Sequence, residues 1–312
     1  MNWKIKAILQ KFLAISRIGD LLNHIPATLN KNYHYNVTLY QTHECIRKFS
    51  YCNFKLSEKN IALEIGTGYS LISSIVLHLI GFDKIVSVDV SKDIKLSIIK
   101  KQIIFLESDE IIKLFLSKSV YSKTEIIEKI NFILKLETLD KVLNFLNIIY
   151  IAPYQFNDIQ KDNTKFRYIS SQVVLEHISP NELEKLFSKT KNWLSKDGFC
   201  VHTINFIDHF ANPGFFQDKN ISEFNFLKYS DRYWKFWSGN SIAYTNRLSY
   251  LYYLDLCEKL ELNVIDFIGE NYRPREELNS KLIHIDILKK YNSDVNIDDI
   301  TKFQRGTLVI KS

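Results

Sequence analysis

Residues 61–70 read Ile-Ala-Leu-Glu-Ile-Gly-Thr-Gly-Tyr-Ser, and this stretch decides the fold. Its apolar beginning predicts a buried parallel strand. Residues 71–80 follow with apolar side chains spaced as on one face of a helix. A strand, a glycine turn and a helix in this order bring backbone N–H groups and a helix N-terminus against a nucleotide-like ligand. The stretch therefore predicts an α/β protein with such a ligand at the turn.

The residues around the two glycines narrow the class of ligand. A dinucleotide-binding turn needs a small residue where Leu71 stands, and a phosphate-loop NTPase needs a lysine that does not follow Gly68 at the required spacing. Glu64, two residues before the first glycine, would repel a pyrophosphate and suits a cation. The pattern disfavours a nicotinamide or flavin dinucleotide and favours a positively charged ligand.

Two segments resemble class I S-adenosylmethionine-dependent methyltransferases. The run Glu64-Ile-Gly66-Thr-Gly68-Tyr-Ser70 resembles their motif I, usually E/D-x-G-x-G-x-G, with Ser70 in place of the third glycine. The run Ser171-Gln-Val-Val-Leu-Glu-His-Ile resembles the S-x-x-V-L-E-H-I segment of the same superfamily. The resemblance covers about residues 58–205 and, more loosely, residues 246–312.

The resemblance implies an α/β, Rossmann-like, seven-stranded mixed sheet. Its strand order is 3-2-1-4-5-7-6, with strand 7 antiparallel, helices on both faces and helical insertions. Residues 1–55 are expected to form a helical cap, and residues 56–312 the methyltransferase domain. One insertion, at about 103–147, is predicted to be helical and to form a lid or a subunit contact. A second, at about 205–245, is aromatic, and either faces the substrate or forms a small core of its own.

Local signals predict where several elements begin and end. Gly81 is typical of the residue that follows a helix. Residues 84–89 then read as a second buried strand. Ser179, Pro180 and Glu182 predict the start of a helix, as an N-cap, a first-turn proline and a capping-box carboxylate.

The resemblance implies S-adenosyl-L-methionine as the cofactor. Asp89 stands at the end of the second strand, where a carboxylate binds a ribose diol through paired hydrogen bonds. Asp158, after the third strand, is the candidate contact to the adenine amino group, with Gln155 and Asn157 behind it; loop solvation explains all three equally well. The expected cofactor-binding residues are Glu64, Gly66, Thr67, Gly68, Asp89, Val90, Asp158 and Ser171.

Methyl transfer to a hydroxyl or an amine needs a base, and histidine suits this role. His209 is the first candidate, because it follows the fifth strand beside Asp208, a carboxylate able to orient it. His177, just after the fourth strand, is the second candidate. His202 alternates with apolar neighbours inside the fifth strand and is interpreted as structural.

The aromatic insertion and the segment after it supply candidates for contacting the acceptor. Arg247 suits an anionic or sugar-like molecule, although it fits an internal ion-pair network equally well. The expected acceptor contacts are Asp208, Trp234, Asn246 and Arg247. No metal site is expected, because the four cysteines show no metal-binding spacing.

Composition limits the partners. The net charge of +6 is spread along the chain, without a basic cluster interleaved with aromatics, so no nucleic-acid partner is expected. No apolar run is long enough for a membrane span, and the N-terminus does not read as a signal peptide. Cysteines without a disulfide pattern fit a reducing compartment, so a cytoplasmic protein is expected. The oligomeric state stays open.

These observations predict an S-adenosylmethionine-dependent methyltransferase that modifies a small-molecule or glycan-like acceptor at oxygen or nitrogen. The alternative is a non-catalytic protein, binding the cofactor or serving as a scaffold. A nucleotide-dependent oxidoreductase is disfavoured by Leu71 and Glu64. An RNA methyltransferase is disfavoured by the dispersed charge.

Overall fold

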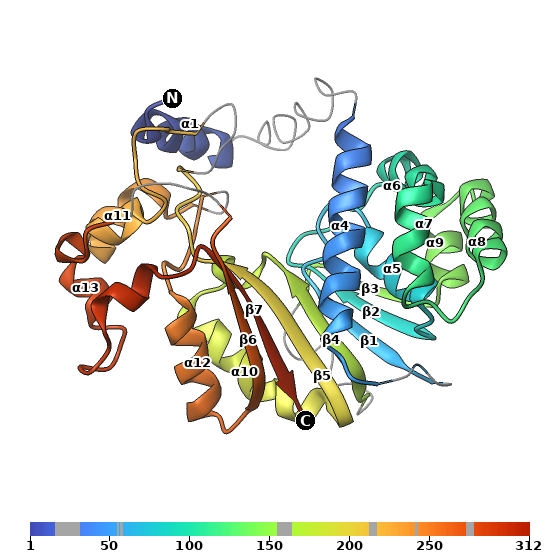
Figure 1. Ribbon diagram of the computed structural model, residues 1–312. Helices are drawn as coiled ribbons and strands as arrows, with labels where there is room; N and C mark the ends of the chain where they lie inside the picture. Colours follow the sequence, from blue (N-terminus) through green and yellow to red (C-terminus); the bar gives the residue numbers. More distant parts are fainter. Residues whose placement is uncertain are drawn as a thin grey trace. The chain divides into compact units, whose positions relative to one another are not determined.

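The computed structural model describes residues 1–15, 32–54, 56, 59–154, 164–211, 217–240, 243–272 and 278–312. Seven strands in these ranges form one sheet, in the order β3-β2-β1-β4-β5-β7-β6 (Figure 1). The strands are β1 (Ile61–Ile65), β2 (Lys84–Val88), β3 (Ile148–Ile151), β4 (Phe166–Gln172), β5 (Leu194–Asn205), β6 (Asn263–Glu270) and β7 (Arg305–Lys311). This order confirms the one expected from the resemblance to class I methyltransferases.

The sheet is parallel at the glycine turn and antiparallel at β7. β1 pairs in parallel with β2 and with β4, and β2 pairs in parallel with β3. The Phe206 N–H donates to the Gln304 carbonyl at 2.9 Å, and the Ser312 N–H donates to the Gly198 carbonyl at 3.0 Å. Residue numbers thus rise along β5 as they fall along β7, which makes β7 antiparallel, as expected.

The chain divides into two compact units. The glycine-turn unit comprises Pro26–Gln172, Lys189–His202 and Val309–Ser312. The aromatic unit comprises Met1–Ile25, Val173–Ser188 and Thr203–Leu308. Residues 1–55, expected to form one cap, are thus divided between the two units.

Helices of the glycine-turn unit begin and end where the local sequence directs. Ser122 and Glu125 form a reciprocal capping box at the start of α8, and the Thr138 side chain caps α9. Gly81, with a φ of 127°, follows the end of α5. The helices are α4 (Tyr33–Ser50), α5 (Ile72–Ile80), α6 (Leu96–Ile103), α7 (Asp109–Leu116), α8 (Lys123–Lys135) and α9 (Leu139–Phe145), with a 3₁₀ turn η1 (Ile104–Glu107).

A buried lysine joins α4 to two strands of the glycine-turn unit. The Lys48 side chain is 1% exposed, and its Nζ donates to the Ser171 carbonyl of β4 at 3.0 Å. The same Nζ lies 4.0 Å from the Glu64 carboxylate of β1. Glu64 in turn accepts a hydrogen bond from the Ser170 hydroxyl. Both buried charges therefore have partners within the unit.

The aromatic unit consists of short helices and β6, with parts of β5 and β7. The Ser179 hydroxyl accepts the Glu182 N–H at 3.4 Å, so α10 (Pro180–Trp193) begins at the expected residues. The other helices are α1 (Trp3–Ile15), α11 (Asp231–Ser238), α12 (Tyr250–Lys259) and α13 (Ile285–Leu288), with 3₁₀ turns η3 (Leu175–His177), η4 (Asn225–Lys228), η5 (Ser280–Leu282) and η6 (Ile297–Thr301). Within the described ranges, no helix is both long and apolar enough to cross a membrane.

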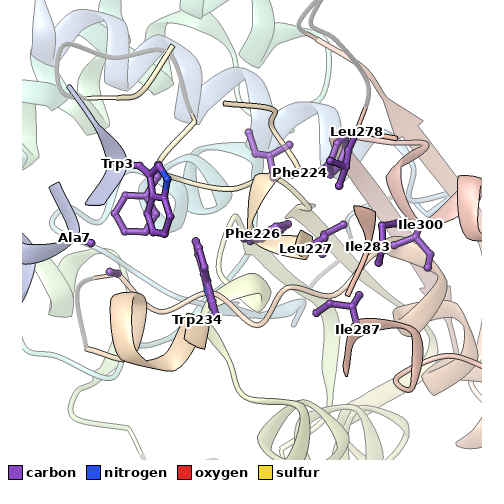
Figure 2. Close-up of a cluster of buried hydrophobic side chains, with 13 residues drawn as sticks. Trp3, Ala7, Phe224, Phe226, Leu227, Trp234, Leu278, Ile283, Ile287 and Ile300 are labelled. Carbon is purple, nitrogen blue, oxygen red and sulfur yellow. The ribbon is translucent and has the colours of Figure 1, made fainter. Parts of the chain in front are cut away.

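Aromatic side chains of residues 205–245 pack into a core with α1 and the C-terminal segment (Figure 2). Trp234 stacks on Tyr229, with ring centroids 5.9 Å apart and an interplanar angle of 11°. Its other ring neighbours include Trp3 of α1, at 5.6 Å, and Phe210, at 5.8 Å. The aromatic insertion therefore contributes to a buried core that it shares with α1 and the C-terminal segment.

Truncation of Trp234 is expected to destabilise the protein. Trp234→Ala removes a side chain that is only 4% exposed at the centre of this core. The expected loss is about 3–5 kcal/mol in the free energy of unfolding, as for other large-to-small core substitutions. Urea denaturation followed by far-UV circular dichroism measures it. Phe236→Ala on the same helix is the control, because Phe236 is 64% exposed; equal losses for the two variants would contradict the packing described here.

Candidate functional site

The glycine turn between β1 and α5 is closed by hydrogen bonds to β2. The N–H groups of Gly66 and Thr67 donate to the Val88 carbonyl at 2.8 and 3.3 Å. The Gly68 N–H donates to Oδ2 of Asp89 at 2.7 Å. Gly66 and Gly68 have φ values of 83° and 66°, which glycine adopts at little cost. The protein itself therefore takes up three backbone donors that the sequence pattern directs at a ligand.

Asp89 and Val90 border open space beside this turn. The half-buried Asp89 carboxylate also accepts the Ser91 N–H through Oδ1, at 3.2 Å, and each of its oxygens keeps a further lone pair. The Val90 side chain is 80% exposed. A Cβ built on Gly68 would meet no atom within 4 Å. Three expected cofactor residues thus lie together: a carboxylate, an apolar side chain and a glycine facing free space.

The side chains of Glu64 and Thr67 contact other residues inside the glycine-turn unit. Glu64 is 1% exposed and has its charge balanced by Lys48, so it does not present that charge to a ligand. This corrects the expectation that Glu64 seats a cation directly, and gives it a positioning role instead. The Thr67 hydroxyl lies 2.7 Å from the Ser87 hydroxyl, which ties the glycine turn to β2.

Ser171 belongs to a buried polar chain. Its hydroxyl lies 2.8 Å from Nδ1 of His202, and Nε2 of that histidine lies 2.9 Å from Sγ of Cys200. Burial, with a smaller effect of the Lys48 charge, lowers the pKa of His202 to about 3. His202 is therefore neutral and structural. Ser171, whose hydroxyl contacts it, also has a structural role. Asp158 lies outside the described residues.

A cluster of three side chains in the aromatic unit, Glu176, His177 and His209, combines one carboxylate with two imidazoles. Glu176 and His177 belong to η3, and His209 follows β5. One ligand-type atom of each side chain lies within 4.8 Å of the others. The two imidazole centroids are 5.1 Å apart. The structure therefore brings the two expected catalytic histidines together and adds Glu176 to them.

The Glu176 carboxyl group is buried without a compensating charge. It is 3% exposed, and no basic side chain of the described residues forms an ion pair with it. Among these residues, neither carboxylate oxygen accepts a hydrogen bond of normal geometry. Burial raises the pKa of Glu176 to about 8, although nearby backbone N–H groups of Glu176 and Asn205 oppose this shift. Such a buried carboxylate either binds a proton or needs a cation.

Asn246 holds the turn that carries this cluster. Its Nδ2 donates to the carbonyls of Leu175 and Ile178, at 2.8 and 3.0 Å. Its backbone N–H donates to the Glu176 carbonyl at 2.8 Å. Both of these side-chain hydrogen bonds of the Asn246 amide support the η3 turn. The contacts therefore give Asn246 a positioning role in place of direct acceptor binding.

Arg247 and Trp234 are committed to the interior of the aromatic unit. The Arg247 guanidinium donates to the carbonyls of Phe226 and Tyr229, at 2.9 and 2.7 Å, and pairs with the Asp231 carboxylate. Arg247 is only 3% exposed, and Trp234 only 4%. The structure therefore replaces their expected acceptor contacts with roles in the ion-pair network and the aromatic core.

Asp208 is fully buried and supports the backbone around His209. Its Oδ1 accepts the Phe210 N–H at 2.8 Å, and its Oδ2 accepts the Asn225 amide at 3.4 Å. Burial raises the pKa of Asp208 to about 7, while these hydrogen bonds and the Lys6 charge lower it. Lys6 Nζ donates to the His209 carbonyl at 3.3 Å. Asp208 therefore shapes the loop from which His209 projects.

Two important residues were missing from the sequence-based site. Glu176 belongs to the L-E-H-I segment, where a carboxylate next to a candidate catalytic histidine was a usable signal. Lys48 is one of many lysines in the chain, and no local pattern marks it as buried. Only its tertiary contacts distinguish it.

No protein-family model matches the chain, and no curated protein is similar to it in sequence. Among solved structures, an S-adenosylmethionine-dependent methyltransferase from Mesorhizobium loti aligns at 11% identity and a TM-score of 0.43, over 87% of this chain and 98% of that chain. Another, from Methanosarcina mazei, aligns at 11% identity and a TM-score of 0.42, over 83% of this chain and 94% of that chain. Phosphoethanolamine N-methyltransferase 2 from Haemonchus contortus, in complex with S-adenosyl-L-methionine, aligns at 14% identity and a TM-score of 0.42. The alignment covers 86% of this chain and 52% of that chain. Similarity at this level does not bear on ligand or activity.

The buried His202 is expected to make stability depend on pH. Its folded pKa is about 3 and its ordinary value is 6.5, so the unfolded chain binds a proton more readily between these pH values. His202 should therefore contribute a fall of about 1.4 kcal/mol per pH unit in the free energy of unfolding as the pH drops below about 6.5. Denaturant titrations of wild type and His202→Gln across this range measure the contribution. The slopes of the two proteins should differ by this amount; parallel profiles would refute the assignment.

Proposed function

We propose that this chain is an S-adenosyl-L-methionine-dependent methyltransferase that modifies a small-molecule or glycan-like acceptor at oxygen or nitrogen. One observation carries the proposal. The Gly68 N–H binds Asp89 at 2.7 Å, which fixes the glycine turn against the acidic end of β2, beside free space. In open α/β sheets, ligands bind at the carboxyl ends of the parallel strands.

The residues at the turn make different contacts with the cofactor in this proposal. Asp89 keeps lone pairs for the two ribose hydroxyls, and the exposed Val90 side chain offers an apolar surface to the adenine ring. Gly68 borders open space, and the positive φ values of Gly66 and Gly68 would strain any other residue at either position. Glu64, Thr67 and Ser171 support this arrangement from inside, and Asp158 remains a candidate for the adenine amino group.

Methyl transfer makes modest chemical demands on the protein. The cofactor carries the methyl group on a positively charged sulfur, so the protein's main task is to bring the acceptor into line with the methyl carbon. An acceptor hydroxyl or amine must lose a proton, and we assign this step to the site that contains His209 and His177. Neutral imidazole suits the step, and burial lowers the pKa of His177.

Cofactor binding is the first test. Isothermal titration of the full chain with S-adenosyl-L-methionine should show one site. Asp89→Asn preserves an acceptor for the Gly68 N–H but removes the charge that binds the ribose, so affinity should fall by ~10–100-fold. Asp109→Asn is the matched control, because its side chain is 86% exposed on α7. Absence of S-adenosyl-L-methionine binding by the intact chain would refute the proposal.

Turnover is the second test. A metabolite extract is incubated with the protein and cofactor bearing an isotopically labelled methyl group, and mass spectrometry detects labelled products. His209→Ala should lower the rate of labelling by ~10²–10⁴-fold, as expected on loss of a proton-transfer group, without changing cofactor affinity. His43→Ala, at an exposed histidine of the glycine-turn unit, should retain the activity. Cofactor binding without any labelled product would instead indicate a non-catalytic binding protein.

A further inference from the structure

We propose that Glu176, His177 and His209 bind one divalent transition-metal ion, and that this ion holds the methyl acceptor through an oxygen atom. Metal binding rests on contacts within the aromatic unit alone. Acceptor binding rests in addition on the proposed methyltransferase function, and it names the acceptor class: a small molecule with a hydroxyl group able to ligate a metal. Sequence spacing pointed to no metal site because these ligands come from two separate segments of the chain.

The three side chains have the spacing of a metal-binding set. Their ligand atoms lie within 4.8 Å of one another. Two ligand atoms of one tetrahedral ion, each ~2.1 Å from it, are separated by ~3.4 Å, so side-chain rotations that draw the three groups together by about an ångström bring the set to coordination distance. One carboxylate and two imidazoles are the ligands found in zinc hydrolase sites and in mononuclear iron sites with open positions.

The Glu176 carboxylate provides an independent sign of a cation. It is 3% exposed, and neither oxygen accepts a hydrogen bond of normal geometry from the described residues. No lysine or arginine of these residues pairs with it, in contrast to Glu64, whose charge faces Lys48. A bound metal ion supplies the positive charge that this buried side chain lacks.

The histidine beside it is prepared for ligation. His177 Nδ1 lies 2.9 Å from the Tyr244 carbonyl, which can only accept, so Nδ1 carries the proton and Nε2 presents its lone pair. Ligating histidines usually donate their second ring N–H to a carbonyl or a carboxylate in this way. The Asn246 amide fixes the turn beneath both Glu176 and His177. The first ligands are therefore oriented by a second layer of contacts.

The ligand set also selects the metal and leaves room for an acceptor. Two nitrogen ligands favour zinc, copper, iron or nickel over magnesium, which prefers oxygen. Three protein ligands leave at least one coordination position open. His177 keeps part of its surface in contact with solvent, which gives a side from which a small molecule can approach the cluster.

Such an ion changes how the acceptor loses its proton. A hydroxyl oxygen bound to such an ion would have a lowered pKa and would release its proton to solvent water. The resulting oxygen nucleophile would form a bond to the methyl carbon as the carbon–sulfur bond breaks. The sulfur keeps that electron pair, and the products are the methylated acceptor and S-adenosylhomocysteine. In this pathway the two histidines act as ligands.

Metal binding is tested without any turnover. The full chain is stripped with a chelator, dialysed and titrated with Zn²⁺, and bound zinc is counted by mass spectrometry of the metal. One ion per chain is expected, with magnesium binding much more weakly. Glu176→Gln and His209→Ala should each lower zinc affinity by more than ~100-fold, since loss of an outer-shell partner alone costs ~10–100-fold. Zinc should also raise the melting temperature of the wild type but not of these variants.

Glu184→Gln is the matched control, because Glu184 is an exposed carboxylate of the aromatic unit paired with Lys259. It should bind zinc like the wild type. Failure of the wild type to bind zinc would overturn the metal site. So would equal zinc binding by the wild type and both cluster variants, or magnesium binding as tight as zinc binding.

The acceptor step is tested in the labelling assay. Labelled product should decrease when the metal is removed and return when Zn²⁺ is restored. Labelling that persists without metal overturns the acceptor step and leaves the methyltransferase proposal standing. A chain that binds zinc but not S-adenosyl-L-methionine overturns the methyltransferase proposal and leaves the metal site standing.

Discussion

The buried contact between Lys48 and Glu64 is the constraint on which the glycine-turn unit depends. Two charges, each almost fully buried, lie 4.0 Å apart, and the lysine also donates to the backbone of β4. Burying either charge alone would cost several kcal/mol, so the pair holds α4 against β1 and β4. Motif I thus carries a carboxylate with an internal partner, whereas Asp89, at the end of β2, is only half-buried and is the carboxylate that we propose for the ligand.

The two units treat their charged groups differently. In the glycine-turn unit, Glu64 has a cationic partner and Asp89 is half-buried at an open edge. In the aromatic unit, the buried Arg247 is satisfied by carbonyls and by Asp231, whereas Glu176 has no such partner among the described residues. A buried carboxylate without a charged partner is more informative about binding than the number of polar residues.

Much of the fold was predictable because its signals are local. The glycine turn, the second strand and the capped start of α10 follow from residue types at short spacing. The strand order was also expected, from the resemblance of two segments to a known family. That Gly68, Asp89 and Val90 lie together was predictable because strand ends place such residues systematically. The acceptor side was not, because exposure of Trp234, Asn246 and Arg247 depends on distant packing.

The sequence by itself determined the class of fold and the position of the glycine turn, because periodicity, glycines and caps act through neighbouring residues. Only the tertiary structure decided which polar groups are left for a ligand. It paired Glu64 with Lys48, enclosed Ser171 with His202, and brought Glu176 to two histidines. Desolvation and charge pairing arise from residues that are close in space and far apart along the chain, so no local pattern encodes them.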